Sequence, residues 1–154
     1  MRVGELTAIS RNNFGHGLSI GDISLTSETM KVILRFSKTD QRGKSSTLHF
    51  SLGPDATLCP VIAMQRFLDM RPKVQGPLFI HYGGDPLSRY QFGRVLTRGI
   101  STVGLSPANF SSHSFRIGAA TSAAMSGIPI DTIKKLGRWQ SYAVNLYIRP
   151  HHIL

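Results

Sequence analysis

Three motifs near the carboxyl end decide the fold: His113-Ser114-Phe115-Arg116, Leu136-Gly137-Arg138-Trp139 and Tyr147. The first motif opens an apolar stretch with the pattern of a helix, and the second follows a shorter helical pattern. His113 and Arg116 are three residues apart, so on a helix their side chains lie on one face, about one turn from each other. We therefore expect a helical C-terminal region in which a basic pair faces a tyrosine.

A tyrosine that faces clustered cations points to chemistry at a phosphodiester. The phenol of tyrosine has a pKa of about 10, so a protein that uses it as a nucleophile must surround it with positive charge and proton acceptors. Arg116 suits that task, because a guanidinium donates two parallel hydrogen bonds to phosphate oxygens and stays charged. His-x-x-Arg alone is a common pattern, and its distance from Tyr147 is what makes it informative.

Length and charge narrow the class of protein. A chain of 154 residues has the size of one domain and can remove roughly 68 to 70% of its unfolded surface from water. Eighteen Lys and Arg against eight Asp and Glu give a formal charge of +10 and a pI near 10.5, which favours nucleic acid as the partner. A basic surface that binds nothing specific remains the alternative.

Other features exclude several classes of site. Cys59 is the sole cysteine, so an internal disulfide and a zinc site built from paired thiolates are excluded, and we expect a small core residue. The N-terminus lacks the apolar region of a signal peptide, and the longest uncharged apolar stretch, 117–130, falls short of the roughly 20 residues that span a bilayer. We expect a soluble protein.

Patterning along the chain predicts a mainly α fold with one small antiparallel sheet. Period-2 alternation over 32–36 and 48–52 predicts a hairpin whose basic tip is 38–44, and 18–25 is a weaker strand candidate. Helices are expected at 5–9, 60–70, 89–103, 113–126 and 131–136, with a last one beginning after Ser141. Ser112 and Ser141 are candidate N-caps, and Ser88 with Gln91 has the form of a capping box.

The motifs together resemble the catalytic domain of tyrosine recombinases, the phage-integrase family. That family carries His-x-x-Arg, then Leu-Gly-His or Leu-Gly-Trp, then a tyrosine nine residues after that His or Trp. This chain has His113, Arg116, position 138 and Tyr147 in that register. The opening Arg2-x-x-Glu5-Leu6 is similar to the motif that holds the family's first arginine, and Ser37-Lys38-Thr39-Asp40 matches the location of its lysine. The resemblance covers nearly all of the chain.

The resemblance implies a role for each of these residues. Tyr147 would attack the scissile phosphate and leave a 3′-phosphotyrosyl link with a free 5′-hydroxyl, while Arg2 and Arg116 stabilise the transition-state charge. Lys38 would protonate the departing 5′-oxygen, and His113 would assist proton removal from Tyr147 or bind phosphate. Glu5 would brace the site through hydrogen bonds. The resemblance implies that neither a metal nor a small-molecule cofactor is required, because guanidinium groups meet the charge that a divalent ion would neutralise. Religation would need no ATP, because the covalent link conserves the bond energy.

Three assignments within this site have competitors. Tyr142 competes with Tyr147, although on an α-helix the two point about 140° apart, so only one can face the site. Lys44 competes with Lys38, and with Arg42 it forms the rest of a basic, DNA-binding hairpin tip. Position 138 departs from the family pattern, since it holds Arg138 with Trp139 beside it; either side chain could fill the usual place.

Two other functions are compatible with the sequence, and the family resemblance implies a further domain. Residues 119–137 can be interpreted as a helix-turn-helix module with Lys134 and Lys135 toward DNA, and an inactive recombinase remnant that only binds DNA is a further rival. Relatives carry a helical core-binding domain before the first arginine, whereas Arg2 is almost the first residue here. We expect 1–154 to be the catalytic domain alone, with double-stranded DNA and other recombinase protomers as partners and no membrane. The motifs Lys38-Thr39-Asp40 and Gly137-Arg138-Trp139 are most similar to those of recombinases of eukaryotic mobile elements. This resemblance implies a nuclear location, or a cytoplasmic one if the host is a prokaryote.

Overall fold

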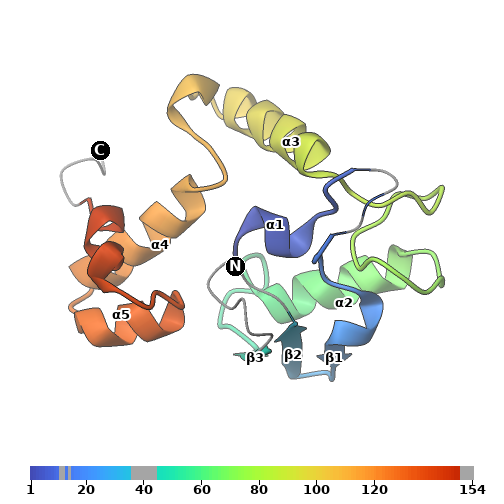
Figure 1. The fold of residues 1–154 in the computed structure, drawn as a ribbon, viewed down its shortest axis with the longest axis horizontal. Coiled ribbons are helices and arrows are strands. Elements are labelled where there is room, and N and C mark those ends of the chain that lie inside the picture. The colour runs from blue at the N-terminus through green and yellow to red at the C-terminus, as the bar shows by residue number, and fades with distance from the viewer. Residues whose placement is uncertain (11–12, 14, 36–44, 150–154) are drawn as a thin grey trace. The chain divides into compact units, whose positions relative to one another are not determined.

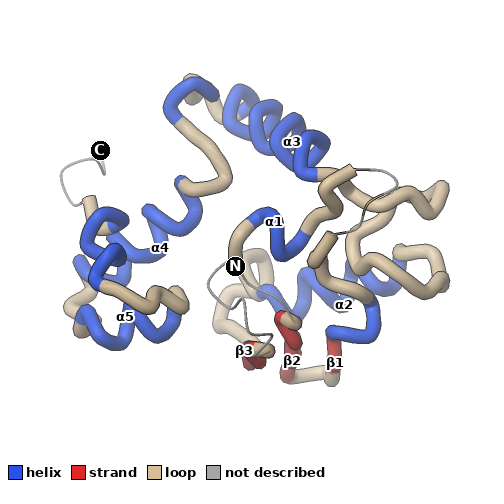
Figure 2. The backbone as a smooth tube through the Cα atoms, in the orientation of Figure 1, coloured by secondary structure: helices blue, strands red, loops and turns tan. Residues whose placement is uncertain are grey.

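The computed structural model describes residues 1–10, 13, 15–35 and 45–149 of the chain. Backbone contacts divide it into two compact units, which are described separately. The N-terminal unit is Val3–Phe92, and the C-terminal unit is Met1–Arg2 with Gly93–Leu154. The predicted fold class is confirmed, because helices dominate and the sheet is small and antiparallel (Figures 1 and 2).

In the N-terminal unit, three short strands form a sheet in the order β1-β2-β3 (Figure 1). They are β1 (Ile23–Leu25), β2 (Thr29–Leu34) and β3 (Ser46–Ser51), and both pairings are antiparallel. The two strands of the expected hairpin are thus paired, although Leu52 lies beyond β3 and is exposed. Position 36 and the predicted tip, 38–44, lie outside the described residues. The strand expected over 18–25 is shorter than predicted, because Ile20–Asp22 forms a turn of 3₁₀ helix first.

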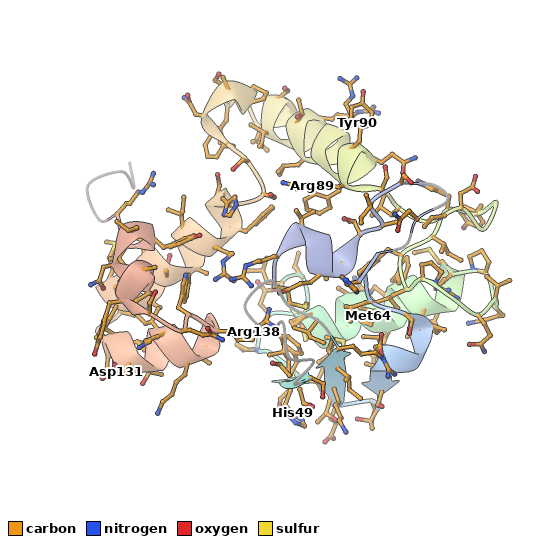
Figure 3. All side chains as sticks on the ribbon, in the orientation of Figure 1. His49, Met64, Arg89, Tyr90, Asp131 and Arg138 are labelled. Carbon is orange, nitrogen blue, oxygen red and sulfur yellow. The ribbon has the colours of Figure 1, made fainter. Side chains whose placement is uncertain are left out.

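The core of this unit lies between the sheet and α2 (Pro60–Met70). Alternate residues of β2 point inward, namely Met30, Val32 and Leu34, and Val61 of α2 is fully buried among them. Cys59, at the start of α2, is buried in the same cluster, as its residue type predicted. Figure 3 labels Met64, which lines the inner side of α2, and His49 on the exposed side of β3.

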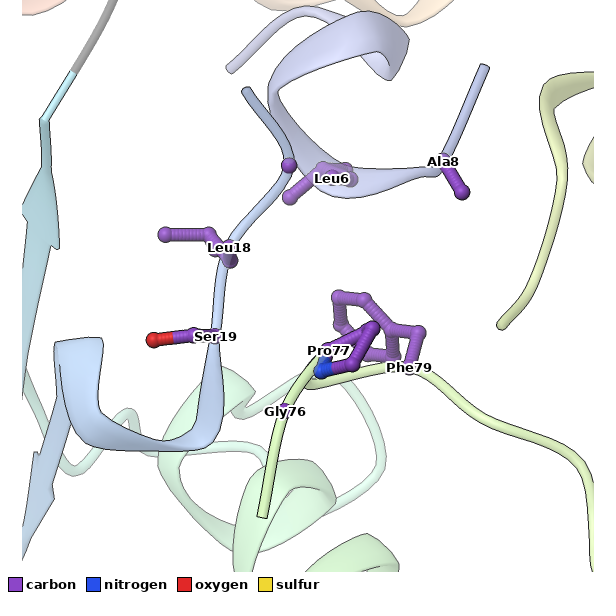
Figure 4. Close-up of a pocket in the computed structure, with 8 residues that line it drawn as sticks. Leu6, Ala8, Leu18, Ser19, Gly76, Pro77 and Phe79 are labelled. Atoms are coloured by element: carbon purple, nitrogen blue, oxygen red, sulfur yellow. The ribbon is translucent and has the colours of Figure 1, made fainter. Parts of the chain in front are cut away.

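Arg71 ends α2 as a buried cation that is satisfied by backbone carbonyls. Its guanidinium donates four hydrogen bonds of 2.7 to 2.9 Å to the carbonyl oxygens of Pro72, Val74, Pro77 and Leu78. Burying a charge is costly unless every donor finds an acceptor, so this set of bonds fixes the loop after α2. Beside the loop, a cavity of about 180 Å³ is lined mainly by apolar groups of Leu6, Leu18, Pro77 and Phe79 (Figure 4).

Helix α1 (Val3–Leu6) is shorter than the expected 5–9 and begins earlier. Helix α3 (Arg89–Thr102) begins where predicted and ends one residue before the expected position 103, and its capping box is present. The Ser88 amide donates to Gln91 Oε1 at 2.9 Å, and the Gln91 amide donates back to Ser88 Oγ at 3.3 Å. A short 3₁₀ turn, Pro107–Asn109, follows.

The C-terminal unit is built from α4 (Ser114–Met125), α5 (Ile130–Leu136) and the 3₁₀ helix η3 (Tyr142–Tyr147). Its core is Ala120, Ile133 and Val144, one residue from each element. The small side chain at Ala120 lets the elements approach closely, and Gly127, with φ of +75°, forms the turn between α4 and α5. In Figure 1 α4 and α5 lie next to each other.

Two predicted caps in this unit have different outcomes. Ser141 caps η3 as expected, because its side chain accepts a hydrogen bond from the Ala143 amide. Ser112 does not cap α4; His113 holds the N-cap position, and the hydroxyls of Ser111 and Ser114 bond the nearby amides instead. No helix in the part of the chain that the structure describes is long and apolar enough to cross a bilayer.

Candidate active site

Four predicted site residues meet in the C-terminal unit: His113, Arg116, Trp139 and Tyr147. We call these four the aromatic-arginine cluster. His113 is the N-cap residue of α4 and Arg116 lies in its first turn, while Trp139 follows α5 and Tyr147 ends η3. Residues more than 30 positions apart in the sequence are therefore brought to one place by the packing of three short elements on Ala120, Ile133 and Val144.

Arg116 lies at the centre of the cluster. Its Cζ atom is 4.3 Å from the centroid of the Trp139 ring and 5.7 Å from that of Tyr147, both within the range of cation–π attraction. Its Nη2 atom also donates a hydrogen bond of 3.0 Å to the carbonyl oxygen of Gly137. The side chain is only 8% exposed, so the guanidinium is held in one position by groups on several sides.

Tyr147 is half-buried and its ring faces the cluster. The ring centroid is 5.1 Å from that of Trp139 and 6.3 Å from that of His113, which is itself exposed. The amino end of α4 adds partial positive charge near His113 and Arg116, because the first amides of a helix have no partner within it. A phenol, an imidazole and a guanidinium therefore lie where a phosphate could contact all three.

Tyr142, the competing nucleophile, lies in a different environment. It is 63% exposed, and its ring contacts the Lys134 ammonium at 4.4 Å. The element that carries both tyrosines is a 3₁₀ helix instead of the α-helix assumed from the sequence. At three residues per turn, five positions still separate the side chains by about 120°, so the two tyrosines again face different ways. The Tyr147 ring thus faces Arg116, and the Tyr142 ring faces Lys134.

Trp139, and not Arg138, is the residue that the described contacts place against Arg116 and Tyr147. Arg138 has a positive φ of 54°, rare for a residue with a side chain, and Trp139 packs on Arg116 and Tyr147. Gly137 permits this packing: a Cβ atom there would lie 1.6 Å from Cζ3 of Trp139. Figure 3 labels Arg138 after α5 and Asp131 in the first turn of that helix.

The other predicted site residues lie in several different parts of the chain. Arg2 belongs to the same unit as the cluster, whereas Glu5 is buried in α1 of the N-terminal unit. Lys38, Arg42 and Lys44 lie outside the described residues. Lys135 is exposed on α5, as a DNA-binding residue requires, while Lys134 is partly covered. The roles of Arg2, Glu5 and Lys38 stay predictions from the sequence.

Thr121 is a residue that the sequence interpretation missed. It lies on α4, is 1% exposed and makes hydrogen bonds to the backbone around Tyr147. A signal was present, because Thr121 and Ser122 are two polar positions between Ala120 and Ala123, in a stretch assigned to close packing. A buried hydroxyl needs a hydrogen-bond partner, and that need could have drawn attention to it.

Comparison with known proteins finds a matching family and a curated relative. The model of the phage integrase family matches residues 1–152. A curated relative, the integrase/recombinase xerD homolog of Selenomonas ruminantium, is 28% identical over 163 residues, which covers 98% of this chain and 46% of the relative. The chain thus spans about half the length of that relative, and no solved structure matches it significantly. With a match over nearly its whole length, the chain belongs to the phage integrase family of tyrosine recombinases.

Proposed function

We propose that this chain is the catalytic part of a recombinase that breaks and rejoins DNA strands through Tyr147. The observation that carries the proposal is the packing of Tyr147 against Arg116, with the guanidinium 5.7 Å from the phenol ring. Family membership supports the reaction class, and the charge of +10 supports a polyanionic substrate.

In the proposed reaction, the phenolic oxygen of Tyr147 attacks a backbone phosphorus of duplex DNA. The bond between phosphorus and the 5′-oxygen breaks, giving a 3′-phosphotyrosyl link and a 5′-hydroxyl. Arg116, joined by Arg2, neutralises the charge that develops on the non-bridging oxygens. His113 accepts the phenolic proton or binds the phosphate, and Lys38 protonates the departing oxygen. A second attack by a 5′-hydroxyl reverses these steps and rejoins the strand.

The proposal includes the substrate, the partners and the biological event. Duplex DNA is the substrate, other recombinase protomers assemble with the chain on it, and a core-binding domain outside these residues clamps the duplex. The biological event is integration or recombination of a mobile element, in the nucleus if the host is a eukaryote. Residues 1–154 act as one catalytic domain in this proposal.

A nicked suicide duplex tests the reaction. If the scissile strand carries a nick just beyond the cleavage site, the leaving fragment diffuses away and the covalent intermediate accumulates. The chain should yield a protein–DNA adduct that survives denaturation. Tyr147→Phe should abolish the adduct, and the matched change Tyr142→Phe should leave it intact, because that ring lies away from Arg116.

Two results would replace the proposal. An adduct that persists in Tyr147→Phe would assign the nucleophile to another residue. Binding to duplex DNA without any adduct would favour a DNA-binding module or remnant, for which α4, the Gly127 turn and α5 supply a helix-turn-helix shape.

A further inference from the structure

Thr121 joins helix α4 to the backbone on both sides of Ile148, directly after Tyr147. Its hydroxyl oxygen accepts a hydrogen bond of 3.0 Å from the Arg149 amide, and it lies 3.1 Å from the carbonyl oxygen of Tyr147, to which it can donate. The side chain is 1% exposed, so water does not compete for these bonds. One hydroxyl therefore bridges two backbone groups of the segment that carries Tyr147.

The single proton of the hydroxyl has two possible acceptors. The carbonyl oxygen of Ile117, one turn earlier on α4, lies 2.8 Å from Thr121 Oγ1, closer than that of Tyr147. Such a bond to the preceding turn is common for threonine in helices. The bond from the Arg149 amide does not depend on this choice, because the hydroxyl is the acceptor there. The bond from the Arg149 amide is therefore present in either case, whereas the carbonyl oxygens of Tyr147 and Ile117 share the hydroxyl proton.

The position of Thr121 on α4 relates this bridge to the cluster. Arg116 precedes Thr121 by five residues on the same helix, a rise of about 7.5 Å. The backbone of Tyr147 is held at Thr121, and its ring contacts Arg116 and His113, nearer the start of α4. The tyrosine side chain thus extends back along α4 from a fixed point, so one rigid helix sets both the cation and the origin of the phenol.

We propose that Thr121 is a positioning residue, which sets the reach of the Tyr147 phenol toward the phosphate held by Arg116. This inference rests on the proposed function. In this proposal Thr121 acts through the peptide groups that flank Ile148. A misplacement of about 1 Å in reacting groups can cost on the order of 10²-fold in rate, so loss of the bridge should slow attack without weakening DNA binding.

Two substitutions separate the hydroxyl from the shape of the side chain. Thr121→Val keeps the branched shape and removes the hydroxyl, whereas Thr121→Ser keeps the hydroxyl and removes the methyl group. Thr102→Val is the matched control, because the Thr102 hydroxyl makes the same kind of bond, 3.0 Å to the Arg98 carbonyl, on an exposed side of α3. If packing alone mattered, the Ser variant would be affected more than the Val variant.

The first measurement is the single-turnover rate of adduct formation on the suicide duplex at saturating DNA, together with the Kd for that duplex. Thr121→Val should lower the rate about tenfold or more with an unchanged Kd. Thr121→Ser and Thr102→Val should stay within about threefold of the unmodified chain. A Val variant as fast as the unmodified chain would overturn the inference, as would equal losses in Val and Ser.

The second measurement detects the bridge without catalysis. Hydrogen exchange at the Arg149 amide should accelerate in Thr121→Val and stay slow in Thr121→Ser, because the amide loses its acceptor only in the first. If Thr121→Val fails to fold, Thr121→Cys replaces it, since a thiol is a weaker acceptor. An intermediate rate in Thr121→Cys supports the bridge, and a rate equal to that of the unmodified chain contradicts it.

These outcomes keep the two proposals distinct. An unmodified chain that forms no adduct contradicts the proposed function and removes the catalytic consequence of Thr121. Exchange at Arg149 that is unchanged in Thr121→Val contradicts the bridge itself, even where the adduct forms normally.

Discussion

At the scale of single residues, the cluster depends on the shape of a guanidinium as much as on its charge. Arg116 stacks on Trp139 while donating to the Gly137 carbonyl, two contacts that a lysine ammonium cannot make together. Trp139 therefore does two things at once, since it supports the cation and packs against the Tyr147 ring. The chemistry proposed for Tyr147 follows from this pairing.

Replacing Arg116 by lysine tests the importance of that shape. Arg116→Lys should slow adduct formation about 10²- to 10³-fold, the usual cost of losing one preorganised donor to a developing negative charge. The rate is measured by single-turnover assay at saturating duplex. Arg66→Lys, an exposed change on α2, serves as the control. A normal rate in Arg116→Lys would mean that charge alone suffices.

Gly137 is a second residue with a sharp prediction. A Cβ atom at this position would overlap the Trp139 ring, so Gly137→Ala should displace that ring at a cost of about 1 to 3 kcal/mol in the free energy of unfolding. Trp139 is the only tryptophan, so intrinsic fluorescence reports the displacement directly.

The control for Gly137→Ala is Gly118→Ala on α4, where a new Cβ has open space. Because alanine favours helix over glycine, this change should stabilise the unit by about 0.5 to 1 kcal/mol and leave the fluorescence unchanged. An unaltered spectrum in Gly137→Ala would show that the ring has room that the structure does not give it.

At the scale of elements, Asp22 ties the turn before β1 to the end of β2. It accepts hydrogen bonds from the Ser19 amide at 2.9 Å and from Arg35 Nε, and it is 4% exposed. Burial raises the pKa of Asp22, but the hydrogen bonds from Ser19 and Arg35 together outweigh burial and hold the pKa below its ordinary value of 3.8.

The lowered pKa makes the contribution of Asp22 to folding stability decrease at low pH. Because the folded-state pKa is lowered, the stabilisation from Asp22 is present above about pH 3.8 and is lost as the pH falls through the folded-state value. Asp22→Asn should therefore lower the free energy of unfolding by about 1.5 kcal/mol at pH 6 and by less at pH 3, measured by urea denaturation. An equal difference at both pH values would contradict this account.

At the scale of the whole molecule, the excess of positive charge should govern affinity for DNA. Each phosphate contact contributes about 0.9 to the slope of log K against log salt concentration. Lys135→Ala should therefore reduce the magnitude of this negative slope by about 1, because the Lys135 side chain is exposed on α5. Lys134→Ala should lower it less, since that ammonium contacts the Tyr142 ring. Equal slopes for the unmodified chain and both lysine variants would show that α5 does not contact DNA.

Sequence patterns predicted elements best where a local signal was strong. Pro60 and Arg71-Pro72 bounded α2, and the Ser88–Gln91 pair marked the start of α3. Patterns failed where packing decides: three neighbouring serines competed to cap α4, and the last helix adopted 3₁₀ geometry. The order of the motifs predicted that Arg116 and Tyr147 would meet, but Thr121 and the stacked position of Trp139 depend on three-dimensional contacts that sequence spacing does not encode.

In the proposed reaction the Tyr147 oxygen becomes bonded to DNA phosphorus. Proteolysis of the adduct trapped on a suicide duplex, followed by mass spectrometry of the peptide that retains nucleotide, identifies the residue that carries this bond. We expect a phosphodiester at Tyr147, linked to the 3′ end of the cleaved strand. Nucleotide attached to Tyr142 or to any other side chain, or a peptide map free of nucleotide after demonstrated binding, would contradict the proposed reaction.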